Sequence, residues 1–317
     1  MKRLRFVLLA AALASAFAGR GLCAETVRVV DCVRDPSLDV WTASDVRYAH
    51  AVMTEVFKRA GIVPEWTTPG TRASTPENDA DVICSAFRTP ELLEKYDFPL
   101  QPMNKMRFAL YADPKRAKEM IATKLTDWDW PNMKVGYSPV AQGQSDDRTH
   151  YFEHARLSPG GYVEFPTSAG AVQALLGGDI DALFLYTTGT CIPDRLAQIV
   201  PIGTRNAYFA VKKGKPELLA ALVKAYRDFY IDDIEKIDAL REKHLMLPKP
   251  AKRVRVAAYS RGDIFRVSPD GVHSGSLEKW LSTIASSTRW DLDYVYGGFD
   301  ESIEDVKRGR LDLIGGL

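Results

Sequence analysis

The sequence predicts an α/β protein in which parallel sheets are covered by helices. Two observations support this fold class. Short apolar runs alternate with longer amphipathic stretches over most of the chain, and that alternation begins a second time near residue 253. Such alternation is typical of βαβ units, whose helices lie on the faces of a parallel sheet. The length of 317 residues suggests about two domains, and a hydrophobic content of 46% is ordinary for proteins that form a core.

Strands are predicted where about five apolar residues follow one another. These runs are residues 27–32, 63–67, 81–85, 107–111, 134–137, 162–165, 182–186 and 207–212. Helices are predicted where the apolar residues recur with helical spacing instead. These stretches are residues 44–60, 90–96, 146–157, 168–176 and 216–230, followed by a charged helix that ends near residue 244.

The chain starts the same structure twice. TVRVVDC at residues 26–32 and DADVICSAF at residues 79–87 correspond to RVRVAAYS at residues 253–260 and GRLDLIGGL at residues 309–317. In each pair an apolar strand is followed, after a helix, by a second strand that an acidic residue precedes. The helix of the second copy is predicted at residues 276–287. Similarity at this spacing indicates duplicated domains.

A stiff, polar break formed by Pro248, Lys249 and Pro250 precedes the repeat, as in linkers between domains. We therefore expect a domain at residues 25–247, a linker at residues 248–251 and a truncated second domain at residues 252–317. Because the second copy has far fewer residues than the first, we expect it to have exposed strand edges and an incomplete core. Such a segment would be poorly ordered or prone to aggregation.

The first residues have the pattern of a secretory signal peptide: a basic start, an apolar run at residues 6–18 and small residues beyond it. We expect cleavage after Ala24, so that the signal peptide is residues 1–24 and the mature chain is periplasmic. The apolar run is shorter than the roughly 20 residues that span a membrane. An uncleaved anchor and lipidation at Cys23 are the alternatives.

Export places the mature chain in an oxidising compartment, where Cys32, Cys84 and Cys191 are considered as disulfide partners before metal ligands. Cys32 and Cys84 end two strands that are expected to be neighbours in one sheet. A disulfide between them is one interpretation, and two buried, reduced thiols are the other.

The composition excludes some classes of partner. A formal net charge of +1, from 42 basic and 41 acidic residues, provides no long-range field for nucleic acid. Partners are therefore expected to be small molecules. The sequence has no phosphate-binding Gly-rich loop, HExxH motif or G-x-S-x-G motif, so we expect neither a cofactor nor catalysis. His150, Glu153 and His154 have a spacing that can hold zinc. No further ligand to complete the site is evident, and we interpret these residues as a polar helix face.

Three segments in this order resemble the type 2 periplasmic solute-binding proteins, bacterial extracellular solute-binding family 3, whose members deliver polar amino acids to ABC importers. The segments are DVICSAFRTPELLEKYDF at residues 81–98, AGAVQALLGGDIDALFLY at residues 169–186 and YFAVKKGKPELL at residues 208–219. The resemblance implies two α/β lobes that bury a ligand in a cleft between them and close by a hinge motion. Lobe one would be residues 25–106 with 206–247, and lobe two residues 107–205.

The chain departs from this family at two positions. In amino-acid-binding members an Arg after the Thr-Pro-Glu motif binds the ligand carboxylate, and an acidic residue near the end of the strand after the Gly-x-x-Asp-Ala turn pairs with the ligand amine. Here these positions are Leu92 and Tyr186. Because charge-assisted hydrogen bonds contribute about 1.5–3 kcal/mol each, we expect that a standard α-amino acid is not the ligand.

The remaining candidate ligand-binding residues are aromatic residues, hydroxyl residues and one arginine, which suit a neutral or ring-bearing ligand. They are Trp41, Trp66, Ser85, Phe87, Arg88, Ser138, Thr167, Tyr186 and Thr187. Core or rim packing is the alternative for Trp41 and Trp66, and a solvated surface charge is the alternative for Arg88.

Three functions are compatible with these features. The first is periplasmic solute binding, with an ABC permease as partner. The second is the exported sensory region of a larger receptor with a membrane signalling domain, because residues 252–317 resemble the tandem sensor modules of bacterial sensor kinases and diguanylate cyclases. The third is a dehydratase-like enzyme, since fold does not fix function.

Overall fold

The computed structural model describes residues 26–30, 40–67, 80–138, 152, 157–187, 195–247, 249–250, 252–259, 261–267 and 273–315. The predicted signal peptide, Cys32, Cys191, the candidate zinc residues and nearly all of the predicted helix at 146–157 lie outside these residues. None of the helices in the described ranges is long and apolar enough to cross a membrane.

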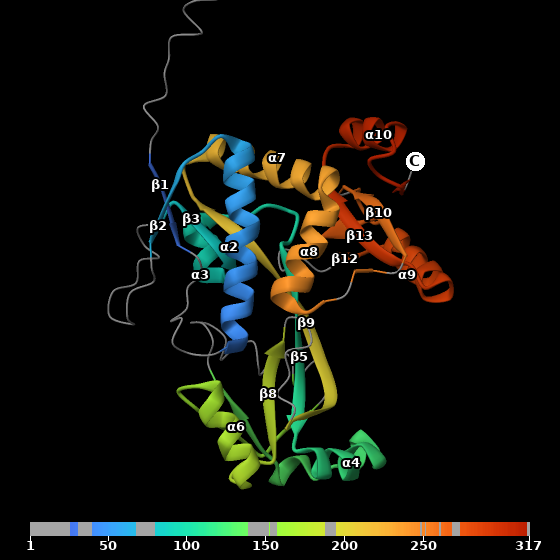
Figure 1. Cartoon of the computed structure of the whole chain (residues 1–317). Coiled ribbons are helices and arrows are strands. Elements are labelled where there is room, and N and C mark those ends of the chain that lie inside the picture. Colours follow the sequence, from blue (N-terminus) through green and yellow to red (C-terminus); the bar gives the residue numbers. More distant parts are fainter. Residues whose placement is uncertain are drawn as a thin grey trace, which may run out of the picture.

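One sheet runs through the N-terminal part of the chain, residues 26–247 (Figure 1). Its strand order is β2 (Pro64–Thr67), β1 (Val27–Val30), β3 (Val82–Ala86), β9 (Ala197–Lys212), β5 (Asn104–Ala112), β8 (Ala182–Thr187), β6 (Lys134–Tyr137) and β7 (Gly161–Glu164), with β4 (Tyr96–Asp97) beside β9. β1 is parallel to β2 and β3, and β6 is parallel to β7 and β8. The antiparallel pair β5 and β9 joins these two parallel sets.

The predicted strands are all present, but β9 begins ten residues before the predicted start at residue 207. Pro201 and Gly203 interrupt the apolar pattern of this stretch. The register between β5 and β9 shifts beside them, because Phe108 pairs with Gly203 and Ala109 pairs with Pro201. An irregular register accommodates residues that weaken a regular ladder. The sequence pattern therefore does not reveal the first ten of the 16 residues of this strand.

The helices lie on the faces of the sheet (Figure 1). They are α2 (Val40–Ala60), α3 (Pro90–Lys95), α4 (Pro114–Ala122), α6 (Ser168–Gly177), α7 (Pro216–Asp232) and α8 (Ile234–Leu245), with short 3₁₀ turns at Leu125–Asp127 and Trp130–Asn132. The helix α4 is not among the predicted helices. Its start is defined by Asp113, whose carboxylate accepts from the backbone N–H groups of Lys115 and Arg116 at 3.0 and 3.4 Å.

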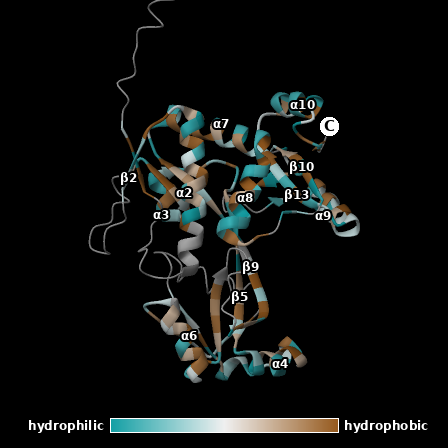
Figure 2. Ribbon diagram, viewed as in Figure 1, coloured by the Kyte–Doolittle hydropathy of each residue, from teal (hydrophilic) through white to brown (hydrophobic). Residues whose placement is uncertain are grey.

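Separate hydrophobic clusters support the two parallel sets of strands. One lies where α2, α7 and α8 cover β1 and β3, and includes Val29, Val82 and Phe229. Another lies on β5, β6 and β8, and includes Leu110 and Val135. Figure 2 shows hydrophobic residues along β5, β8 and β9 and mostly hydrophilic ones along α10 (Phe299–Lys307) of the C-terminal segment.

The C-terminal segment, residues 252–315, has the strand order of the start of the chain. It contains β10 (Arg253–Ala258), β11 (Arg266–Val267), β12 (His273–Ser274), α9 (Ser276–Thr288), β13 (Asp291–Tyr296), α10 and β14 (Leu313–Ile314). Its parallel sheet has the order β13-β10-β14, matching β2-β1-β3. The match includes a hydrogen bond: the backbone N–H of Arg28 donates to Asp81 at 2.9 Å, and that of Arg255 donates to Asp312 at 2.8 Å.

The C-terminal segment, whose own core is expected to be incomplete, completes that core against the N-terminal part. Ala257, Val295 and Leu311 are buried in the same cluster as Phe229 and Tyr230 of α7. The N-terminal part therefore supplies the apolar surface that the short copy lacks. A segment that seems too small to bury its own apolar residues can do so against a neighbouring element.

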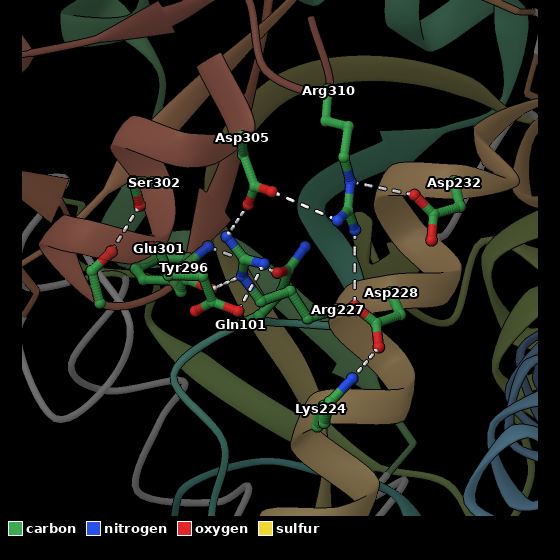
Figure 3. Close-up of polar contacts among 11 residues, drawn as sticks. Gln101, Lys224, Arg227, Asp228, Asp232, Tyr296, Glu301, Ser302, Asp305 and Arg310 are labelled. Atoms are coloured by element: carbon green, nitrogen blue, oxygen red, sulfur yellow. Dashed lines mark hydrogen bonds and ion pairs between the residues drawn. The ribbon is translucent and has the colours of Figure 1, made fainter. Parts of the chain in front are cut away.

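A buried ion pair also joins the two parts (Figure 3). Arg227 of α7 donates to Asp305 of α10 at 2.5 Å, to Glu301 at 2.9 Å and to the backbone carbonyl of Tyr296 at 3.1 Å. The side chains of Arg227 and Asp305 are 6% and 4% exposed. Gly297 permits this close approach, since a Cβ there would lie 2.7 Å from Nε of Arg227.

Candidate functional site

The carboxyl ends of the two parallel sets of strands approach the same stretch of β9. Ala86, the last residue of β3, pairs with Tyr208, while Thr187, the last residue of β8, pairs with Arg107, which pairs with Thr204. Four residues of strand separate these positions along β9, or about 13 Å. In open α/β sheets, ligands bind beyond the carboxyl ends of the strands. We call this region the strand-end site.

Phe87 follows β3 and lies at this site. It is buried with Met106 and Ala207, and the guanidinium carbon of Arg205 lies 4.7 Å from its ring centroid. A cation over an aromatic face is electrostatically favourable. Arg205 is not among the predicted site residues, because the strand that carries it is predicted to begin two residues later.

Arg88 is held by neighbours of the strand-end site. Its guanidinium carbon lies 4.1 Å from the ring centroid of Tyr208, and its Nη2 donates to the carbonyl of Pro99 at 2.5 Å. The ring of Phe98 packs edge-on against that of Tyr208, with the ring centroids 6.3 Å apart. Arg88 therefore makes specific contacts with protein groups, which a solvated surface charge, the alternative interpretation of this residue, would not make. Ser85, two residues before Phe87, is half-buried near the end of β3.

Leu92 lies in the first turn of α3. Its backbone N–H donates to the side-chain oxygen of Thr89, the N-cap residue, at 3.3 Å. Its side chain packs against an apolar cluster that includes Val30, Ile83 and Tyr96. Leu92 therefore serves local packing at the position where the resemblance places a ligand-binding arginine.

Trp66 packs on the α2 side of the sheet. Its ring centroid lies 4.0 Å from that of His50 and 6.0 Å from that of Phe57, both in α2. This is the core-packing role that the sequence left open. Trp41 belongs to the first turn of α2, and its side chain lies outside the described residues.

The candidates from residues 107–205 lie at the carboxyl ends of β6, β7 and β8. Ser138 is half-buried directly after β6. Thr167 caps α6 by accepting from the N–H of Gly170 at 3.1 Å. Tyr186 and Thr187 end β8, where their backbones pair with Phe108 and Arg107, and their side chains lie outside the described residues.

The predicted disulfide between Cys32 and Cys84 remains untested. Cys84 is buried in β3, but Cys32 lies outside the described residues, so the disulfide stays a prediction. Within the described ranges, His, Cys, Asp and Glu residues nowhere gather in a group of three that could hold a metal ion.

The strand order, the crossing pair β5 and β9 and the helices on both faces define a type 2 periplasmic-binding-protein fold, which confirms the predicted fold class. No protein-family model matches this chain, and neither does a curated protein. The structural similarity is to solved structures of low sequence identity.

One similar structure is the ancestral amino acid-binding protein AncCDT-1, a precursor of cyclohexadienyl dehydratase. It has 19% sequence identity and a TM-score of 0.51, and the alignment covers 69% of this chain and 95% of that chain. Another is a histidine kinase sensor domain with similarity to periplasmic binding proteins. It has 17% identity and a TM-score of 0.50, with coverage of 71% and 98%. At these identities the similarity establishes the fold alone.

Proposed function

We propose that this protein binds a small solute between two lobes, residues 25–106 with 206–247 and residues 107–205, which close around it. The solute is not a standard α-amino acid, and the protein is a binding protein without catalysis. The support is the fold together with the strand-end site, where the carboxyl ends of both parallel sets approach β9. The predicted signal peptide places this activity in the periplasm.

The packing of Leu92 is the observation that carries the choice of ligand. Its side chain is occupied in an apolar cluster. The nearest cations along the chain are also engaged, because Lys95 forms an ion pair with Glu91 at 3.9 Å and Arg88 contacts Tyr208 and Pro99. A carboxylate that leaves water needs a charged partner to offset its desolvation. An α-amino acid would lack that partner at α3 and would lose about 1.5–3 kcal/mol of binding free energy.

The chemistry of the candidates favours a neutral or ring-bearing solute. Phe87 supplies an aromatic surface at the end of β3, and hydroxyl groups are expected from Ser85, Ser138, Tyr186 and Thr187. Apolar surface with a few hydrogen-bonding groups is the usual composition of small-molecule sites.

A thermal-shift screen of residues 25–317 tests the proposal. The probes are amino acids, aromatic acids, purines, sugars and polyamines. A ligand at 100 times its Kd adds about 2.7 kcal/mol to the free energy of unfolding. We expect a hit outside the amino acids that Ser85→Ala weakens and that Ser286→Ala, an exposed control on α9, does not. Stabilisation by a standard α-amino acid that depends on Ser85 would refute the choice of ligand.

A second function, the sensory region of a membrane receptor, is favoured by a different observation. The C-terminal segment repeats the β2-β1-β3 order, as a second binding domain in tandem would. Its partner would be a membrane signalling domain, whereas a transport protein would require an ABC permease. The reading frame of the gene can distinguish the receptor function from the transport function. Only the receptor function requires a membrane span and a signalling domain in the same polypeptide.

A further inference from the structure

A pocket of about 430 Å3 lies between the N-terminal part and the C-terminal segment. Residues 101–105, Asn206, Tyr230 and Arg241 line it from the N-terminal part, and residues of α9, β12 and β13 line it from the C-terminal segment. Phe87 and Arg88 do not contribute to it, although Lys105 and Asn206 of its lining adjoin Met106 and Ala207 at the strand-end site. Small-molecule sites have volumes of about 300–1,000 Å3, so the pocket can hold one small ligand.

Three of the four charged residues that line this pocket, Arg241, Asp293 and Glu278, are engaged with protein partners, and the fourth is Lys105. Nη2 of Arg241 donates to the hydroxyl of Tyr230 at 3.2 Å, and that hydroxyl donates to Asp293. Asp293 also forms an ion pair with Nε of Arg253 at 2.8 Å. Glu278 accepts from the hydroxyl of Ser282 at 2.6 Å. A charged ligand that reached Arg241, Asp293 or Glu278 would therefore have to break one of these contacts, which is costly in a buried site.

One group in the pocket lacks a partner. The hydroxyl of Tyr294 is buried, and within the described part of the chain it has no hydrogen-bond partner. The ring of Tyr294 contacts His273 edge-on, with centroids 4.5 Å apart. A buried hydroxyl without a partner carries a desolvation cost that a ligand can remove.

We propose that this pocket is a second ligand site, which takes an uncharged, hydroxyl-rich ring compound such as a monosaccharide or a cyclitol. His273, Tyr294 and Tyr296 line the pocket, and we expect their aromatic surface to contact the ring of such a ligand. The Tyr294 hydroxyl and the amide of Gln101 offer hydrogen bonds. A neutral ligand leaves the Arg241, Tyr230 and Asp293 interactions intact, and Lys105, an exposed residue at the pocket, stays solvated.

The test measures binding of glucose, galactose, ribose and inositol to residues 25–317 by calorimetry and thermal shift, with citrate, glutamate and spermidine as charged probes. We expect at least one uncharged probe to bind, and Tyr294→Phe to weaken it about fivefold, as loss of one hydrogen bond predicts. Tyr162→Phe, an exposed tyrosine of β7, is the matched control and should bind as the unchanged protein does.

The apo proteins provide a second measurement. Because Tyr294→Phe removes a buried hydroxyl without a partner, its melting temperature without ligand should be no lower than that of the unchanged protein. Binding that is insensitive to Tyr294→Phe, dependence on Tyr294 for charged probes only, or no binding of the uncharged probes would each overturn the proposal. If Ser85→Ala weakens the binding of a ligand and Tyr294→Phe leaves it unchanged, that ligand binds at the strand-end site. The two variants therefore distinguish failure of this proposal from failure of the proposed function.

Discussion

His273 is a titratable residue whose pKa depends on burial in the C-terminal segment and on a charge from the N-terminal part. It lies in β12, its Nε2 contacts the hydroxyl of Tyr296, and its ring contacts Phe265 and Tyr294. Burial, and to a smaller extent the positive charge of Lys105, lower the pKa of His273 to about 4, while Glu278 opposes this shift. The sequence shows a histidine after a turn, and nothing near it in the chain indicates this environment.

This histidine should make the protein less stable as the pH decreases. Between about pH 6.5 and about pH 4 the unfolded chain binds a proton at His273 and the folded chain does not. The free energy of unfolding therefore decreases as the pH falls through this window, by up to about 3 kcal/mol. We expect His273→Gln to lose less stability than the unchanged protein between about pH 7 and about pH 4.5, measured by urea denaturation. Equal losses in the two proteins would contradict this assignment.

At the scale of elements, α7 and α10 are fixed to each other by charge. Arg227, on a helix that sequence analysis treated as an ordinary amphipathic helix, is buried by a segment about 75 residues further along the chain. Arg310 adds ion pairs to Asp232 at 3.1 Å and to Asp305 at 3.4 Å (Figure 3). A helical wheel of α7 alone cannot reveal this role, because the partner comes from another element.

Asp305→Ala should destabilise the protein strongly. It leaves Arg227 buried without its closest carboxylate, and breaking a buried ion pair costs about 3–5 kcal/mol. Glu301 remains to compensate in part, so we expect a loss near the lower end, about 3 kcal/mol. Guanidinium denaturation followed by circular dichroism measures it. Glu304→Ala removes an exposed carboxylate of the same helix and should leave the midpoint unchanged; equal effects of the two substitutions would show that the buried pair contributes nothing.

Elements also show the limits of prediction from periodicity. Strands and helices with regular apolar spacing were predicted at the correct places, because that spacing reports which face is buried. The first ten residues of β9 were missed, because Pro201 and Gly203 interrupt the pattern and pairing with β5 on one side overrides it. The short helix α4 was missed because its nine residues are too few to show a clear apolar period, and its clearest signal is the cap residue Asp113.

For the whole molecule, the C-terminal segment is packed on the N-terminal part through a shared core and a charged network. Beyond the Arg227 contacts, Arg253 of β10 makes two hydrogen bonds to Asp238 of α8, at 2.8 and 2.6 Å. Burial raises the pKa of Tyr48, Tyr226 and Tyr230 near this junction, so these hydroxyls stay neutral. Whether the segment aggregates in solution stays a prediction.

Limited proteolysis of residues 25–317 with trypsin can decide between the sequence expectation and the packing. The segment contains many Lys and Arg residues, so local unfolding would expose cleavage sites. Because its core is shared with α7, we expect the segment to resist cleavage and Asp305→Ala to accelerate its loss. Rapid removal of the segment from the unchanged protein, with a stable fragment of residues 25–247 left behind, would support the original expectation instead.

The sequence by itself determined the α/β class, the order of most elements, the repeated β-α-β start and the presence of Leu92 where the resemblance places a ligand-binding arginine. These features are encoded in local periodicity and residue type, which need no knowledge of distant contacts. The tertiary structure alone decided that Trp66 packs against α2, that Arg88 lies on Tyr208, that Arg227 is buried against α10 and that a pocket lies beside Tyr294. Each of these depends on residues that are far apart in the chain, and burial and charge pairing are properties of the assembled neighbours.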